Sequence, residues 1–174
     1  FVNDLSRNIL LKKLSVNDFK KELQKINKGQ RYSTGITLLF SALGAAGFTI
    51  LFGGNIKDFV SAFIIGFIIK LLAIKGSDMQ INQFFINSLT GGIAAFLALL
   101  FVEINLASNL DQTIIGSIML LVPGLAITNA IRDTIAVDLL SGLTRAAEAF
   151  LIAVSIAVGS GAVLSFWISY IGGI

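Results

Sequence analysis

The sequence predicts an all-α membrane protein, a polytopic bundle of five transmembrane helices preceded by a short amphipathic cytoplasmic helix. Hydrophobic residues make up 55% of the 174 residues, charged residues only 13%, and the mean hydropathy is +0.87. A soluble domain carries about 25% charged residues, so about half of the usual solvating surface is missing. The charges that remain are arranged as in a multi-pass membrane protein, with nearly all basic residues on one side.

The transmembrane helices are expected where uncharged stretches can cross a bilayer, which takes about 20 residues. Residues 33–55, 79–102, 112–131 and 149–174 contain no charged residue. A fifth stretch, 59–74, is interrupted only by Lys70 near its end, and a lysine stem can carry its ammonium group to the interface. The expected spans are 33–54, 56–75, 82–102, 112–132 and 145–171.

The distribution of basic residues predicts the orientation. With five spans and a cytoplasmic N-terminus, only Lys57 among the 13 lysines and arginines falls outside. This asymmetry is what the positive-inside rule predicts, whereas a four-span arrangement would separate the basic residues of 7–31 from Arg132 and Arg145. We therefore expect a multi-pass protein of the plasma or inner membrane, with the C-terminus of this chain outside.

Residues 1–31 are expected to form a cytoplasmic segment ahead of the transmembrane domain, 32–174. Ser15 with Asp18 is typical of a helix N-terminus. Apolar residues then recur at helical spacing, which predicts an amphipathic helix over 16–28: Val16, Phe19, Leu23 and Ile26. This helix is expected either to lie on the membrane surface or to pack on a soluble domain.

The fourth span contains a Pro-Gly pair inside an apolar run. Pro123 cannot donate to the carbonyl of Met119, and Gly124 adds backbone freedom at the same point. The sequence therefore predicts that the helix is interrupted or bent here. Transporters often bind their substrates at broken helices, because the freed backbone groups need polar partners.

Polar and charged residues follow this break at helical spacing. Thr128 and Arg132 lie four residues apart, as do Asn129 and Asp133. Asp138 comes next, and then Arg145 with Glu148 at the expected start of the fifth helix. Two interpretations stay open: a substrate and proton site, or structural ion pairs, Arg132–Asp133 and Arg145–Glu148, that cap a hairpin.

The composition excludes several kinds of enzyme site. The chain has no cysteine and no histidine, hence no thiol nucleophile, no imidazole base and none of the usual zinc ligands. Lys70 has no serine one helical turn away, and Asp133 and Asp138 would lie on different faces of a continuous helix. We expect no catalytic residue, no metal site and no cofactor, and hence a protein that is not an enzyme.

The order of these residues resembles the threonine/serine exporter family, and in particular its larger, five-span membrane domain. The resemblance covers nearly the whole chain and is most specific over 123–148. The matching residues are Phe52-Gly53-Gly54, Asp58, Leu121-Val122-Pro123-Gly124, Thr128-Asn129, Ile131-Arg132-Asp133, Asp138, Ser141-Gly142, Arg145 and Glu148.

The resemblance implies export of small amino acids, threonine and serine, driven by the proton gradient. A two-subunit branch of the family is linked to succinate. The family also carries a soluble N-terminal region, and residues 1–14 resemble the tail of that region. It further carries a second membrane half, which is either fused or a separate small subunit. The implied partners are the lipid bilayer, this second half in a homo- or hetero-oligomer, and a small-molecule substrate, but no nucleic acid.

The leading hypothesis is therefore a secondary transporter subunit, and the alternative is a non-transporting membrane scaffold or assembly subunit. Guanidinium groups form bidentate bonds to carboxylates, which makes the two arginines candidates for substrate binding. The expected substrate-binding residues are Pro123, Gly124, Thr128, Asn129, Arg132 and Arg145. The expected proton-coupling residues are Asp133, Asp138 and Glu148.

Overall fold

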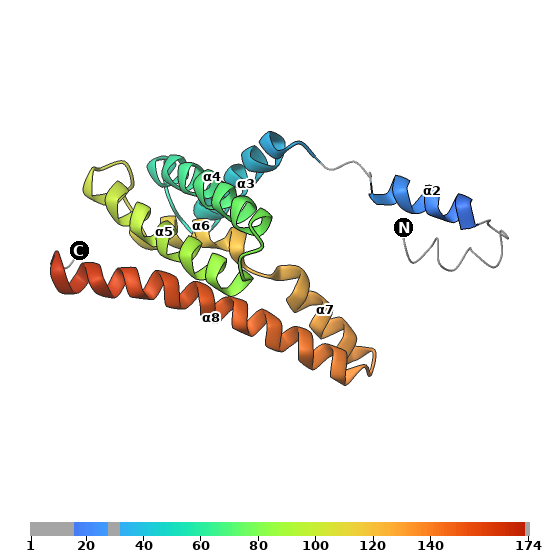
Figure 1. Cartoon of the computed structure of the whole chain (residues 1–174). Coiled ribbons are helices and arrows are strands. Elements are labelled where there is room, and N and C mark those ends of the chain that lie inside the picture. Colours follow the sequence, from blue (N-terminus) through green and yellow to red (C-terminus); the bar gives the residue numbers. More distant parts are fainter. Residues whose placement is uncertain (1–15, 28–31, 173–174) are drawn as a thin grey trace. The chain divides into compact units, whose positions relative to one another are not determined.

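The computed structural model describes residues 16–27 and 32–172, and these are all-helical, with no strand among them (Figure 1). This confirms the fold class expected from the sequence. The helices are α2 (Val16–Asn27), α3 (Thr34–Leu51), α4 (Ile56–Asp78), α5 (Gln83–Glu103), α6 (Leu110–Ile118), the 3-10 turn η1 (Met119–Leu121), α7 (Gly124–Ile135) and α8 (Leu139–Tyr170).

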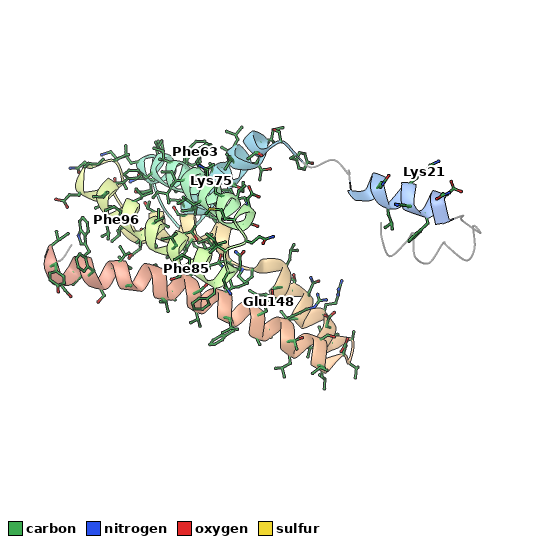
Figure 2. All side chains as sticks on the ribbon, in the orientation of Figure 1. Lys21, Phe63, Lys75, Phe85, Phe96 and Glu148 are labelled. Atoms are coloured by element: carbon green, nitrogen blue, oxygen red, sulfur yellow. The ribbon has the colours of Figure 1, made fainter. Side chains whose placement is uncertain are left out.

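The chain divides into two units between Ile36 and Thr37. In the first unit α2 forms where an amphipathic helix is expected. Phe19 and Leu23 are half-buried, whereas Lys21 is exposed (Figure 2). Ser15, the expected capping residue, and residue 28, the expected helix end, lie outside the described residues.

Within the part of the chain that the structure describes, four helices are long and apolar enough to cross a membrane: α3, α4, α5 and α8. The second of these, α4, contains Lys70. The stretch 59–74, which this lysine interrupts, therefore belongs to a 23-residue helix of spanning length. Two further segments, α6 with η1 and then α7, are together long and apolar enough to form a fifth span. The two segments are bent by 62° at the break between them.

The break lies where the Pro-Gly pair predicts it. Val122 is extended (φ −64°, ψ 128°), because the ring of Pro123 disfavours helical geometry in the residue before it. Pro123 then caps α7, whose first residue is Gly124. A Cβ on Gly124 would meet nothing within 4 Å, so neither space nor a left-handed backbone requires glycine there. Proline alone accounts for the interruption.

Helices α5 and α8 run parallel to each other (Figure 1). Ser88 packs against Gly159, and Gly92 faces Val163. Further along, the rings of Phe96 and Trp167 form a T-shaped pair with their centroids 6.4 Å apart. The positions rise together along both helices, which defines the direction. If α5 and α8 cross the membrane in the same direction, the chain between them must cross it once in the opposite direction. This pairing therefore favours the α6–α7 segment as one broken span rather than a re-entrant loop.

Small residues allow the close helix contacts. A Cβ on Gly66 of α4 would lie 2.7 Å from the Cβ of Ala45 on α3, and one on Gly116 of α6 would collide with Thr49. Such contacts bring backbones together in lipid, where no hydrophobic effect between helices exists. The central apolar cluster comprises Ile65, Ile69, Ala94, Ala95, Ala98 and Ile114.

Helix α8 begins at Leu139, six residues before the expected start of the last span. Asp138 caps it, because its Oδ1 accepts a hydrogen bond from the backbone N–H of Ser141 at 3.3 Å. With 32 residues at 1.5 Å each, α8 is about 48 Å long, whereas a hydrocarbon core is about 30 Å thick. Arg145 and Glu148 therefore lie inside this helix and not at its start. The expected span, 145–171, occupies its later part.

Candidate functional site

The predicted polar residues lie on the hairpin that α7 and the first half of α8 form. The turn between the helices includes Val137 in a left-handed conformation, with φ 65°. Beyond it, Gly142 packs against α7, where a Cβ would collide with Thr134 and lie 3.1 Å from the carbonyl oxygen of Ala130. This contact requires a residue without a side chain, and it brings the charged groups of the two helices within reach of each other.

Asp133 lies between two guanidinium groups. Its Oδ2 is 3.1 Å from Nε of Arg145 on α8, and its Oδ1 is 3.7 Å from Nε of Arg132 on its own helix. The side chain of Asp133 is only 16% exposed, whereas those of Arg145 and Arg132 are 44% and 72% exposed. The carboxylate thus lies at the base of the cluster, and the guanidinium groups are open to the outside.

This arrangement corrects one pairing expected from spacing. The ion pair of Arg145 is made with Asp133 across the hairpin, and not with Glu148 one turn along α8. Glu148 is exposed and makes no ion pair or side-chain hydrogen bond within the described residues (Figure 2). The expected Arg132–Asp133 contact is present, at the longer distance.

Two further predicted residues interact mainly with their own helix. The hydroxyl of Thr128 donates to the carbonyl oxygens of Gly124 at 2.8 Å and Leu125 at 3.2 Å. Asn129 is half-buried on the same helix as Arg132 and Asp133. The structure thus brings together Arg132, Asp133 and Arg145, and it places Thr128 and Asn129 on α7, between the break and the charged cluster.

Asp138 has the role of a helix cap. The hydrogen bonds from the side chain and the backbone N–H of Ser141 lower the pKa of this carboxyl, against a small opposing effect of desolvation, and the charge of Arg145 adds to the lowering. A lowered pKa keeps the group ionised across the neutral range. The hydrogen bond that caps α8 therefore favours the charged form of Asp138.

Asp58, for which the sequence predicted no role, is fully buried in the first turn of α4. Its Oδ1 accepts from the backbone N–H groups of Ser108 (2.7 Å) and Asn109 (2.9 Å). Its Oδ2 accepts from Nδ2 of Asn109 (2.7 Å) and the backbone N–H of Asn55 (2.9 Å). This carboxylate ties the start of α4 to the loop before α6. The Asn55-x-x-Asp58 spacing predicts the helix cap but not the contact 50 residues away.

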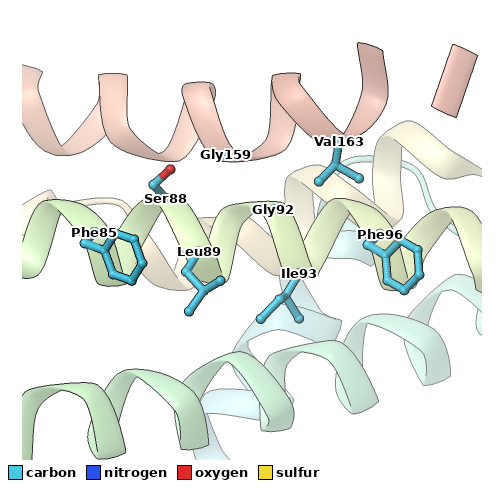
Figure 3. A pocket seen from close by; sticks show the side chains of 8 residues that line it. All are labelled: Phe85, Ser88, Leu89, Gly92, Ile93, Phe96, Gly159 and Val163. Atoms are coloured by element: carbon cyan, nitrogen blue, oxygen red, sulfur yellow. The ribbon is translucent and has the colours of Figure 1, made fainter. Parts of the chain in front are cut away.

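An open groove lies along the contact between α5 and α8 (Figure 3). The side chain of Ser88 points from α5 towards α8 at Gly159, and that of Val163 points from α8 towards α5 (Figure 3). None of the predicted site residues lines this groove. Its lining is Phe85, Ser88, Leu89, Gly92, Ile93, Phe96, Gly159 and Val163.

The apolar helices, the bent helix pair and the charged hairpin define a multi-pass helical membrane protein with a polar cluster beside an interrupted helix. A family described as "putative threonine/serine exporter" matches residues 1–167. The chain therefore belongs to this threonine/serine exporter family, as its resemblance implies. No curated protein and no solved structure matches the chain.

Proposed function

We propose that this protein is a subunit of a secondary transporter that exports a small carboxylate-bearing metabolite, threonine or serine, using the proton gradient. The observation that carries the proposal is the convergence of Arg132 and Arg145 on one carboxylate, directly after a proline break in a transmembrane helix. A substrate carboxylate has the same chemistry as the Asp133 side chain that the two arginines contact. Family membership supports the transport class.

The proposed roles follow from the contacts. Arg132 and Arg145 bind the substrate carboxylate, because guanidinium groups offer planar pairs of donors to it. Thr128 and Asn129 lie beside them for a hydroxyl or ammonium group. Pro123 forms the break, which leaves backbone groups at Gly124 and the start of α7 for polar partners.

Among the candidates for proton coupling, Asp133, Asp138 and Glu148, the contacts favour Glu148. Asp133 lies between two positive charges, and Asp138 accepts the hydrogen bonds of its helix cap. Glu148 keeps its carboxylate free of such partners within the described residues, on the face of α8 that also carries Arg145 one turn earlier.

The proposed orientation places the N-terminus and the 132–145 hairpin in the cytoplasm, so that the site loads from inside. The asymmetry of the basic residues supports it. Because the chain contains no cysteine, single cysteines at positions 16 and 138 can be labelled from one side. Labelling of the two positions from opposite sides would overturn this topology.

Transport can be measured as uptake of radiolabelled threonine, serine and succinate into inverted membrane vesicles that contain the protein with its natural partners. We expect uptake that depends on the proton gradient. Arg132→Lys keeps the charge but loses the planar fork, so uptake should fall about tenfold or more. Lys75→Arg, a matched exchange at the end of α4, is the control. Wild-type vesicles that accumulate none of the three solutes would support the scaffold alternative.

A further inference from the structure

We propose that Asp133 determines which solutes the hairpin accepts, by their charge. It favours zwitterions, which carry one ammonium group beside one carboxylate, over dicarboxylates. This inference rests on the proposed function of the same site. It concerns Asp133 because this acid, alone among the described residues, contacts both arginines.

The first supporting observation is the geometry of the three groups. The guanidinium groups flank the Asp133 carboxylate within 3.1 and 3.7 Å, and both are more exposed than it is. Each guanidinium has five N–H donors and makes no other ion pair or hydrogen bond within the described residues. A solute carboxylate that arrives from the exposed side can therefore bind both arginines without displacing the carboxylate of Asp133.

The second observation is the position of an acceptor next to those donors. In an amino acid the ammonium and carboxylate groups are attached to the same carbon. A site that binds both must place a negative group directly beside its cationic donors. Asp133 meets this requirement, because it contacts the same guanidinium groups that would hold the solute carboxylate.

The third observation is the total charge. The hairpin carries two arginines against three acids, Asp133, Asp138 and Glu148, and hence a net charge of −1 when all are ionised. A neutral zwitterion enters this field without a charge penalty, whereas a dianion meets repulsion from Asp133 at contact distance. One unit charge at about 4 Å in an exposed site changes affinity by roughly fivefold to tenfold.

The test combines a change in the protein, at Asp133, with a change in the solute, the loss of its ammonium group. Threonine and 3-hydroxybutyrate share a carbon skeleton and differ in the ammonium group. Binding of both, and of succinate, is measured by competition against radiolabelled threonine, or against radiolabelled succinate where threonine binds weakly. The variants are wild type, Asp133→Asn and Asp133→Glu, with Asp111→Asn as a matched loss of one exposed acid in the first turn of α6.

We expect Asp133→Asn to weaken threonine binding about tenfold, to leave 3-hydroxybutyrate within about twofold, and to strengthen succinate binding. Asp133→Glu should keep the wild-type order. An unchanged ratio of threonine to 3-hydroxybutyrate in Asp133→Asn would overturn the inference while the proposed function stands. If Asp133→Asn does not fold, wild type that binds both solutes equally overturns it as well. Wild type that binds neither threonine nor succinate would contradict the proposed function itself.

Discussion

Asp133 on α7 and Arg145 on α8 lie 3.1 Å apart, Oδ2 to Nε, and their contact joins the two helices of the hairpin. The pair forms only because Gly142 lets α8 approach the backbone of α7 at Ala130. Arg145 is thereby held towards α7 and not towards Glu148. The roles of the acids along the hairpin follow from this partner choice.

The first prediction concerns proton coupling. Glu148→Gln should abolish gradient-driven uptake, because an amide cannot bind or release the proton, while solute exchange without a gradient continues. Uptake and exchange are measured between pH 5 and 8 in the same vesicles. Loss of both activities, or of neither, would show that Glu148 does not couple the proton.

The second prediction concerns Asp138 and follows from its lowered pKa. For a carboxyl whose folded pKa lies below the ordinary value of 3.8, the stabilising effect of the charge is present above that value and is lost as the pH falls through the folded pKa. Between pH 5 and 8 the charge therefore does not change. Asp138→Asn keeps a capping side chain, so the shape of the pH profile of uptake should match wild type. A displaced midpoint would contradict the assignment of Asp138 as a cap.

The third prediction concerns the break. Pro123→Ala restores a backbone donor and removes the ring, a difference of about 3 kcal/mol in helix preference, so the 62° bend should decrease. The distance between spin labels at the exposed positions Ile115 and Ile131 measures it, and uptake is followed in parallel. Gly124→Ala is the matched control and should preserve the bend, since a Cβ there meets nothing. An unchanged label distance in Pro123→Ala would mean that tertiary contacts hold the bend.

The fourth prediction concerns Asp58. Asp58→Ala leaves four N–H donors without their acceptor at a buried position, and we expect a loss of about 3 kcal/mol in the free energy of unfolding. The midpoint of thermal unfolding in detergent should fall accordingly. Asp111→Asn removes an exposed acid and should change it little. Equal stability of the two variants would show that the clamp between α4 and the loop before α6 contributes nothing.

The fifth prediction compares two glycines of α8. A Cβ on Gly159 would collide with the backbone of Ser88, whereas one on Gly161 meets nothing within 4 Å. Gly159→Ala should therefore destabilise the α5–α8 contact by about 1–3 kcal/mol. Gly161→Ala should stabilise the helix by up to about 1 kcal/mol. Thermal unfolding of both variants measures the difference, and shifts of the same sign would contradict the close parallel packing.

Composition and local chemistry determined much of the fold from the sequence alone. Uncharged stretches set the helices because a bilayer admits only segments that satisfy their own backbone groups. Pro123 determined the break, since a missing N–H and a rigid ring act on the nearest residues whatever the rest of the chain does. The contact between Arg132 and Asp133 was also expected from the sequence, since the two residues are neighbours in the chain.

The tertiary structure decided which charged and polar groups contact each other. Spacing along one helix favoured Arg145 with Glu148, but the close approach at Gly142 places Asp133 nearer. The Asn55-x-x-Asp58 spacing is typical of a local helix cap, yet the other acceptor positions of Asp58 are filled from a loop 50 residues away. The parallel direction of α5 and α8 was likewise set by helix packing. Sequence spacing reports which groups are neighbours within one element, whereas contacts between elements depend on how closely backbones approach, and only the assembled helices fix that distance.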